Sequence, residues 1–358
     1  MCEFIRRNSR EVKAGNVVIG GASPISIQSM TNTDTHDLEA TYRQVAELAE
    51  AGCDIVRITA PDIESVKTFE FLKSKGINIP LVADIHFSAD IAVAAAKSGA
   101  DKIRINPGNI GSEDKVRRVV DACKECSVPI RIGVNAGSLE KDILEKYKKP
   151  TAEALAESAL RHIRILENHG FFDTVVSVKA SDVTTMLEAN RLLAKSCDYP
   201  LHLGVTEAGG GYSAIVKSSI GIGTLLAEGI GDTIRVSLTD DPVKEVEAAR
   251  EILKALKLTD LGGMNIVSCP TCGRTKINLI SLLSEFKERV KQEGLDKLNL
   301  TVALMGCAVN GPGEAREADF GIAGGMGEGL IFRHGEIIRK VPEDKLIDGI
   351  ISELKKQL

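Results

Sequence analysis

Three cysteines toward the C-terminus are the residues best suited to hold a metal centre. Cys269 and Cys272 are separated by two residues, and Cys307 follows further along the chain. Two thiolates three positions apart at the end of a strand can reach one centre, and a third can arrive from another strand end. A four-iron cluster takes one protein ligand for each iron. No second cysteine lies near Cys307, so the fourth ligand is of another kind or is absent.

Glu314 is the natural candidate for that fourth ligand. It follows Cys307 on the same loop, after a Gly-Pro-Gly turn at 311–313 that can direct its side chain back. A carboxylate is a harder and more exchangeable iron ligand than a thiolate. Three cysteines with a labile fourth ligand therefore favour a catalytic cluster over a pure electron carrier.

Two other interpretations of these cysteines stay open at this point. His334 could complete a structural zinc site, and Cys269 with Cys272 could form a thioredoxin-like pair, although that motif should open a helix in a βαβ unit. The second Cys-x-x-Cys, at 123–126, ends a helical pattern. We interpret it as a pair of partly buried helix thiols rather than a metal site.

The first two-thirds of the chain must position whatever chemistry these groups perform. Short apolar, β-branched runs alternate there with longer amphipathic stretches, which predicts βαβ units and a parallel sheet. Eight such units in this length fit a TIM barrel better than a doubly wound sheet, because the glycine fingerprint of the latter does not follow the first run. Residues 11–20 could form a hairpin that closes the barrel floor. The predicted strands are 24–30, 53–59, 80–85, 101–106, 129–134, 174–178, 200–205 and 233–238.

Paired glycines at 262–263 mark a break, after which the order of elements changes. We expect a strand at 265–268, a helix at 276–293, strands at 300–305, 319–323 and 330–340, and a helix from about residue 342. The sequence therefore predicts an α/β fold with two domains: a TIM (β/α)8 barrel at 1–260 that binds the substrate, and a small α+β domain at 261–358 that holds the cluster.

The carboxyl ends of the predicted barrel strands, where TIM-barrel active sites lie, carry alternating cations. Burying these cations is costly unless anions pair with them. A single arginine would more often be part of a structural ion pair, but five at one mouth indicate a multiply charged ligand such as a diphosphate. Gly209–Gly211 could be a phosphate loop or a bare turn. The five cations are Arg57, Arg104, Arg131, Lys179 and Arg235.

Composition excludes several other functions. The formal net charge of −5 argues against a nucleic-acid surface. No run approaches the roughly 18 apolar residues of a membrane span, and the N-terminus lacks the apolar core of a signal peptide. We therefore expect a cytoplasmic protein with no nucleic-acid or membrane partner. In a reducing compartment the eight cysteines are thiols or metal ligands rather than disulfides.

At these residues the sequence resembles the bacterial 4-hydroxy-3-methylbut-2-enyl diphosphate synthase family of the methylerythritol phosphate route to isoprenoids. The resemblance covers essentially the whole chain, and the chain passes directly from barrel to cluster domain, as in the bacterial form. The motifs that carry it are SIQSMTNT at 26–33, DIHF at 84–87, RINPGNIG at 104–111, SCPTCGR at 268–274 and NGPGEA at 310–315.

The resemblance implies an oxidoreductase with a [4Fe-4S] cluster in a domain like those of sulfite and nitrite reductases. The enzyme would reduce 2-C-methyl-D-erythritol 2,4-cyclodiphosphate by two electrons, opening the ring to the allylic diphosphate with loss of water. No flavin or nicotinamide motif is visible, so reduced flavodoxin or ferredoxin is the expected electron donor. The family works as a homodimer in which the cluster domain of one chain closes over the barrel of the other.

The resemblance also assigns roles to individual residues. Cys269, Cys272, Cys307 and Glu314 would hold the cluster, and Glu207 would be a candidate proton donor. Two alternatives remain: a pterin-dependent barrel enzyme with an iron–sulfur domain, and an iron–sulfur electron carrier. The residues expected to bind substrate are Arg57, Asp84, His86, Arg104, Asn106, Arg131, Asn135, Lys179, Arg235 and Ser237.

Overall fold

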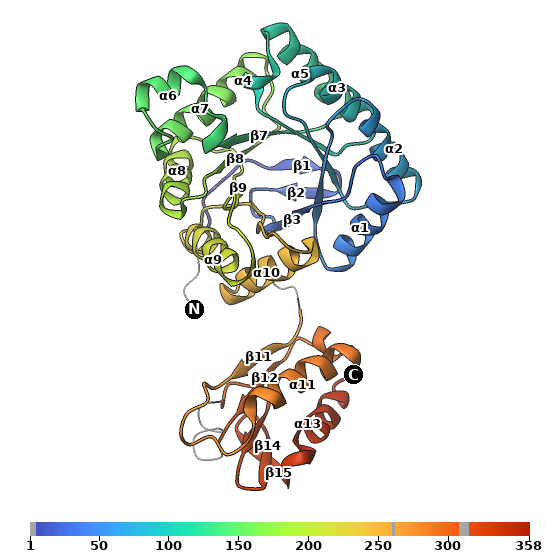
Figure 1. Cartoon of the computed structure of the whole chain (residues 1–358), viewed down its shortest axis with the longest axis vertical. Helices are drawn as coiled ribbons and strands as arrows, with labels where there is room; N and C mark the ends of the chain where they lie inside the picture. Colours follow the sequence, from blue (N-terminus) through green and yellow to red (C-terminus); the bar gives the residue numbers. More distant parts are fainter. Residues whose placement is uncertain (1–4, 260–261, 308–314) are drawn as a thin grey trace. The chain divides into compact units, whose positions relative to one another are not determined.

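The computed structural model describes residues 5–259, 262–307 and 315–358. The chain divides into two compact units, Met1–Thr259 and Asp260–Leu358, which Figure 1 colours from blue to gold and from orange to red. Within the described residues, no helix is long and apolar enough to cross a membrane.

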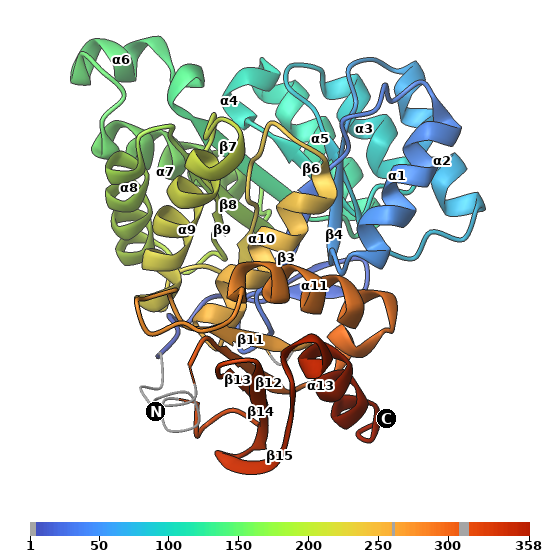
Figure 2. The same cartoon turned by 60° about the horizontal axis from the view of Figure 1, so that its bottom comes forward.

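The first unit is the predicted TIM barrel. Its strands pair in parallel in the order β8-β7-β6-β5-β4-β3-β10-β9, and a parallel bridge between Val176 and Leu201 joins the two ends of this sheet. The ring is therefore nearly closed, with helices around it (Figure 2). The strands are β3 (Ser26–Met30), β4 (Ile55–Thr59), β5 (Leu81–Asp84), β6 (Lys102–Ile105), β7 (Ile130–Asn135), β8 (Thr174–Lys179), β9 (His202–Leu203) and β10 (Thr233–Ile234).

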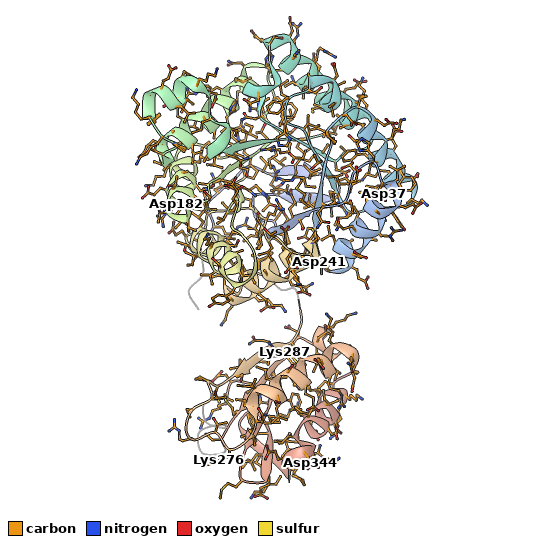
Figure 3. All side chains as sticks on the ribbon, viewed as in Figure 1. Asp37, Asp182, Asp241, Lys276, Lys287 and Asp344 are labelled. Atoms are coloured by element: carbon orange, nitrogen blue, oxygen red, sulfur yellow. The ribbon has the colours of Figure 1, made fainter. Side chains whose placement is uncertain are left out.

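The helices of the barrel begin where the sequence supplies caps. The carboxylates of Asp37, Asp182 and Asp241 each accept a hydrogen bond from a backbone N–H of the first turn, and all three are labelled in Figure 3. The helices are α1 (Leu38–Glu50), α2 (Lys67–Ser74), α3 (Ala89–Lys97), α4 (Pro107–Ile110), α5 (Glu113–Cys126), α6 (Lys141–Tyr147), α7 (Ala152–Asn168), α8 (Val183–Ser196), α9 (Gly211–Ala227) and α10 (Pro242–Ala255), with short 3-10 turns at Glu64–Val66 and Ala136–Ser138.

An antiparallel hairpin closes the amino-terminal end of the barrel. Its strands β1 (Val12–Ala14) and β2 (Val17–Ile19) form an apolar cluster with Ile55, Val82 and Val175, which lie near the starts of β4, β5 and β8. The hairpin predicted at 11–20 is thus a plug beneath the strands. With this end plugged, water and ligands can enter the barrel interior from the carboxyl ends of the strands.

Strand alternation divides the barrel into an apolar outside and a polar inside. Neighbouring positions such as Ile103 and Ile105 join the core shared with the helices, while Lys102 and Arg104 on the same strand face inward with the inward residues of β5 and β7. Above the plug, the barrel interior is therefore lined by polar side chains. Those that are buried include Ser26, Gln28, Lys102, Arg104, Arg131, Ser177, His202 and Thr233.

The second unit has one five-stranded sheet in the order β11-β12-β13-β14-β15, parallel across the first three strands and antiparallel beyond. Its helices α11 (Leu279–Gln292) and α13 (Leu346–Lys355) pack with alternate residues of β12, β13 and β14 in one core. The strands are β11 (Asn265–Ser268), β12 (Thr301–Met305), β13 (Phe320–Gly324), β14 (Glu328–Arg333) and β15 (Glu336–Pro342), and short 3-10 turns lie at Leu295–Lys297 and Glu343–Lys345.

The run at 330–340 is not the single strand that the sequence predicts. It is a hairpin, with β14 and β15 joined at His334 and Gly335, whose φ angles of 47° and 80° are both left-handed. Residues typical of strands stand on both sides of this turn, so the sequence pattern alone predicts one continuous strand. The last helix also begins at Leu346 rather than near 342, because β15 runs on to Pro342.

Candidate active site

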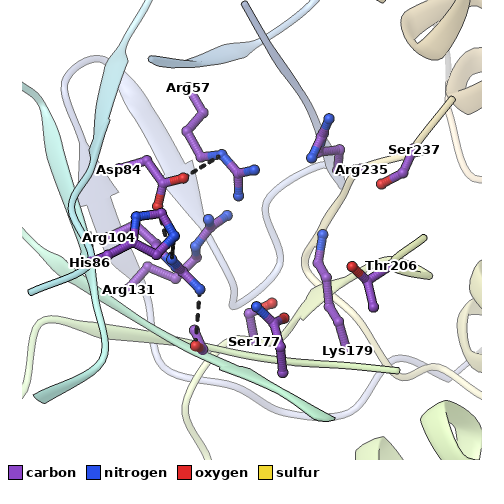
Figure 4. A pocket seen from close by; sticks show the side chains of 12 residues that line it. Arg57, Asp84, His86, Arg104, Arg131, Ser177, Lys179, Thr206, Arg235 and Ser237 are labelled. Atoms are coloured by element: carbon purple, nitrogen blue, oxygen red, sulfur yellow. Dashed lines mark hydrogen bonds and ion pairs between the residues drawn. The ribbon is translucent and has the colours of Figure 1, made fainter. Parts of the chain in front are cut away.

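The carboxyl ends of the barrel strands surround one strongly polar cavity, which encloses about 460 Å³ of space not filled by atoms. Of the ten predicted substrate-binding residues, all but Asn106 line it (Figure 4). The residues that line the cavity are Arg57, Asp84, His86, Arg104, Arg131, Gly133, Asn135, Ser177, Lys179, Thr206, Arg235 and Ser237.

Asp84 binds two of the guanidinium groups in this cavity. Its Oδ1 lies 3.0 Å from Nη1 of Arg104, and its Oδ2 lies 3.6 Å from Nε of Arg57. Burial alone would raise the pKa of Asp84, but Arg57, Arg104 and Arg131 together lower that pKa to about 2. Asp84 is therefore a carboxylate at any physiological pH.

Arg104 is held by three groups at once. Besides Asp84, its Nη1 lies 3.2 Å from Nε2 of His86, and its Nη2 donates to the carbonyl of Gly133 at 3.0 Å. The guanidinium lies against the backbone of Gly133, where an added Cβ would collide with Nε and approach Nη2 to 2.7 Å. Glycine at 133 thus creates the space in which Arg104 lies.

Glu245 forms an ion pair with Arg235, as Asp84 does with Arg57 and Arg104. Glu245 was not predicted from the sequence. It lies on α10 and is 4% exposed. Its Oε1 accepts from Nη2 of Arg235 at 3.1 Å and from the backbone N–H of Leu238 at 3.0 Å, while its Oε2 accepts from Ser29 at 2.8 Å. The sequence did contain one sign of this role: Glu245 lies beside Val246 on the apolar face of an amphipathic helix, where a carboxylate needs a partner.

The cavity keeps an excess of positive charge. Five basic side chains meet two carboxylates, Asp84 and Glu245, among the described residues that form its ion pairs, so the basic groups outnumber the acidic ones by three. Arg131 is 1% exposed and donates to Gln28 at 3.3 Å. Lys179 has no hydrogen bond or ion pair with any described residue, although it is also buried. An arrangement of this kind binds a multiply charged anion.

Asn106 lies just outside the cavity lining, at the start of α4. It is 4% exposed, and both polar atoms of its side chain are buried without a partner. The turn that follows is fixed from α7: the backbone N–H of Gly108 donates to Nδ1 of His162 at 3.0 Å. The other ring nitrogen of His162 lies 3.1 Å from Glu140, which also accepts from Ser158 at 2.7 Å. His162 and Glu140 thus hold the segment that carries Asn106.

Glu207, the predicted proton donor, does not line the cavity. It is exposed and has a left-handed φ of 53°, while its neighbour Thr206 does line the cavity. The glycines that follow form the start of α9: Gly210 is its N-cap and Gly211 its first residue.

The three cysteines predicted to bind metal lie in the second unit. Cys269 follows β11 directly, Cys307 follows β12 after one glycine, and these strands are parallel neighbours. The backbone N–H of Gly306 donates to the Sγ of Cys269 at 3.2 Å. Cys272 is exposed, and the backbone N–H and then the side chain of Arg274 lower its pKa. These features favour thiolates, the form that binds metal.

The described residues do not contain a ready group of three or more His, Cys, Asp or Glu side chains around one metal position. Glu314, the predicted fourth ligand, lies outside the described residues. His334, the ligand of the zinc alternative, is in the turn between β14 and β15. In α5, Cys123 is buried and Cys126 is half-buried, as expected for helix thiols.

Comparison with known proteins identifies the family. A family model described as the GcpE TIM-barrel domain matches residues 9–250, and one described as the GcpE protein C-terminal domain matches residues 265–356. The chain belongs to the GcpE family. The first match lies within the first compact unit and the second match within the second, so each unit of this GcpE chain corresponds to one family domain.

Curated relatives of this GcpE chain are similar over nearly their whole length. The 4-hydroxy-3-methylbut-2-en-1-yl diphosphate synthase (flavodoxin) of Clostridium perfringens is 58% identical over 97% of this chain and 98% of its own. The protein of the same name from Fusobacterium nucleatum is 54% identical over 99% and 98%. Among solved structures, a type I 3-dehydroquinate dehydratase from Clostridium difficile matches 69% of this chain and 98% of its own length at 17% identity, with a TM-score of 0.51. This likeness concerns the barrel fold alone.

Replacing Gly133 with alanine tests whether the position of Arg104 matters for anion binding. The new Cβ would displace the guanidinium from Asp84 and Gly133. We expect Gly133→Ala to weaken the binding of inorganic pyrophosphate, measured by calorimetry, by about tenfold or more, equivalent to about 1.4 kcal/mol. Gly137→Ala is the matched control, because a Cβ there meets no atom within 4 Å. Equal affinities in the two variants would contradict this role for Arg104.

His162 offers a second test, of the support beneath Asn106. His162→Leu would remove the acceptor of the Gly108 N–H, at a cost of about 0.5–1.5 kcal/mol for the lost hydrogen bond. His162→Asn places an amide oxygen near the position of Nδ1. We expect the leucine variant to lose pyrophosphate affinity under conditions where circular dichroism shows it folded, and the asparagine variant to recover most of that loss. A folded leucine variant with unchanged affinity would make His162 a residue of the core only.

Proposed function

We propose that this chain is a 4-hydroxy-3-methylbut-2-en-1-yl diphosphate synthase that acts on 2-C-methyl-D-erythritol 2,4-cyclodiphosphate. The observation that carries the proposal is the barrel cavity in which five basic side chains meet two carboxylates, in a chain that is 54–58% identical to curated proteins of that name. A cyclic diphosphate has two negative charges, and both can be accommodated by the uncompensated cations.

The cavity residues would bind the two phosphates and leave the carbon skeleton toward the open end. Arg104 and Arg57, already oriented by Asp84, and Arg235, oriented by Glu245, present guanidinium groups that need little rearrangement. Ser177, Thr206 and Ser237 add hydroxyl groups to the same wall. Asn106, whose buried amide has no partner, would complete the set. Preoriented donors of this kind stabilise the charge that develops on a departing phosphate arm.

Cys269, Cys272 and Cys307 would hold a [4Fe-4S] cluster, with Glu314 as the labile fourth ligand. The fit is supported by the N–H of Gly306 that donates to the Cys269 sulfur, by the neighbouring strand ends and by the lowered pKa of Cys272. Such a cluster, when bound, supplies electrons singly and an iron that can accept an oxygen ligand. A carboxylate ligand is easier to exchange than a thiolate, which is the reason to give Glu314 this role.

The overall reaction balances with two electrons. The carbon–oxygen bond that closes the diphosphate ring breaks, a hydroxyl group leaves as water, and a carbon–carbon double bond forms. The departing hydroxyl takes up a proton, for which Glu207 is a candidate donor. The printed names of the relatives specify flavodoxin, so reduced flavodoxin is the proposed electron donor, with ferredoxin as the alternative. We further propose a cytoplasmic homodimer in which each site is completed by the partner chain.

Neither alternative explains the barrel cavity as well. An iron–sulfur electron carrier would have no use for an excess of basic side chains inside a barrel, because burying their charges costs stability without a ligand. A pterin ring needs hydrogen-bonding carboxylates and amides more than arginines. The charge balance of the cavity therefore favours the cyclic diphosphate.

Iron analysis with absorption and electron paramagnetic resonance spectra tests the proposal directly. Protein purified without oxygen should contain a four-iron cluster whose spectrum changes when the cyclic diphosphate is added. With dithionite-reduced flavodoxin, it should convert that compound to the allylic diphosphate. A protein that contains zinc only, or an iron protein whose spectrum is silent to the cyclic diphosphate, would exclude this function.

Glu314→Ala separates a labile ligand from a structural one. Because three thiolates remain, we expect the variant to retain most of its iron while turnover falls by about a hundredfold or more, the order of effect for loss of one essential active-site group. Cys307→Ala is the matched comparison and should lose the cluster. Equal loss of iron in the two variants would mean that Glu314 holds the cluster as firmly as a cysteine does.

A further inference from the structure

Lys179 lies in a different environment from the other cations of the cavity. It is the last residue of β8 and lines the cavity, yet its side chain is 7% exposed. Gly204, just after β9, makes room for it: a Cβ at that position would lie 2.7 Å from Nζ and 3.1 Å from Cε. The side chain of Lys179 therefore packs against the backbone of Gly204, and it is labelled in Figure 4 among the residues that line the cavity.

The charged groups that act on Lys179 are mostly cationic. They are Arg235 after β10, Arg57 on β4 and Arg131 on β7, and Glu245 is the carboxylate that opposes them. The carboxylate of Glu245 is already engaged by Arg235 at 3.1 Å. Within the described residues, Lys179 itself makes no hydrogen bond or ion pair, so a charged ammonium there would be both desolvated and repelled.

Two further buried bases lie deeper in the barrel. Lys102 and His202 are each 0% exposed, and Nζ of Lys102 and both ring nitrogens of His202 lack a partner. Burial and then the nearby arginines lower the pKa of both well below its ordinary value, and the same causes act on Lys179. Lys102 and His202 do not line the cavity, so a bound anion would contact Lys179 alone among these three.

We propose that Lys179 is an uncharged amine in the empty cavity and takes up a proton from solvent when the cyclic diphosphate binds. The ligand in this statement rests on the proposed function. Binding then adds the two negative charges that the wall of arginines lacks, and Nζ gains an anionic partner in place of cationic neighbours only. The proton goes from solvent to the lone pair of Nζ, and no bond of the ligand changes.

Other groups in the cavity are poorer proton acceptors. Guanidinium groups stay protonated in proteins, and Asp84 is held as a carboxylate by Arg57 and Arg104. His86 is the remaining rival, since it lines the cavity with Nε2 3.2 Å from Arg104. In that contact the imidazole nitrogen accepts a hydrogen bond from the guanidinium. The experiment must nevertheless separate His86 from Lys179.

The proposal fixes the sign of the pH dependence of binding. The pKa of Lys179 is lowered without ligand and is raised by the bound anion, so between these two values each binding event takes up a proton. In that window the dissociation constant of the cyclic diphosphate should rise, by up to about tenfold for each unit of increasing pH. Below the pKa of the empty state the lysine is already charged, and affinity should become independent of pH.

Calorimetry in buffers of different ionisation enthalpy measures the proton directly. The cyclic diphosphate is added to the holoenzyme without an electron donor, so no turnover occurs. Each of its phosphates has one ester linkage and one anhydride linkage, so each carries a single strongly acidic oxygen that does not titrate near neutral pH. Any proton taken up therefore goes to the protein. At a pH between the two pKa values of Lys179 we expect uptake of up to about one proton for each ligand bound in the wild-type protein, and close to none in Lys179→Arg, whose guanidinium is already charged.

Lys102→Met is the matched control, because it removes a buried lysine that does not line the cavity, and its proton uptake should equal that of the wild type. If the wild-type protein takes up no proton, the proposal is overturned. It is also overturned if Lys179→Arg still takes up a proton, and that result would point to His86. If Lys179→Arg fails to fold, the pH dependence of the wild-type dissociation constant decides, since a flat profile from pH 6 to 9 excludes the coupling. Absence of any binding would overturn the proposed function itself, whereas binding without proton uptake overturns only the role of Lys179.

Discussion

An excess of buried positive charge at the carboxyl end of the barrel is the constraint on which the rest of the structure depends. Five cations are opposed by Asp84 and Glu245, and each of these carboxylates serves more than one group. Charges taken out of water must be paired or hydrogen-bonded to be tolerated. In the empty cavity only some of the basic side chains are paired, through Asp84 and Glu245. A dianionic ligand therefore stabilises the barrel as well as occupying it.

The architecture supports this excess by placing the cations on strands rather than on loops. Alternate residues on the same strands, such as Ile103 and Ile105, are buried against the helices, which fixes the direction in which Arg104 points. Gly133 and Gly204 provide the spaces that Arg104 and Lys179 occupy. The hairpin plug seals the opposite end with apolar side chains. Because the strands are held on all sides, the charged groups cannot easily separate to relieve their repulsion.

The sequence alone predicted the barrel and the cations well, because both follow from a period of two along each strand. If Ile103 and Ile105 point outward, alternation along the strand makes Arg104 point inward, and this does not depend on how the helices pack. It could not predict which carboxylate pairs with which cation. Glu245 reaches Arg235 from a helix, and that contact depends on how α10 lies on the barrel. The turn at His334 was missed for a related reason: left-handed φ angles at a His-Gly pair leave no trace in an apolar pattern.

The division of the chemistry between two folding units follows from the same constraint. The residues that line the cavity include arginine, lysine, histidine, hydroxyl and amide side chains, but no thiol among those described. The cysteines lie at strand ends of the other unit, where the N–H of Gly306 already donates to sulfur. A cluster of negative thiolates placed among the barrel cations would compete with the substrate for the same charges. Keeping the cysteines on a separate sheet leaves the barrel cations free for the diphosphate that we propose as their ligand.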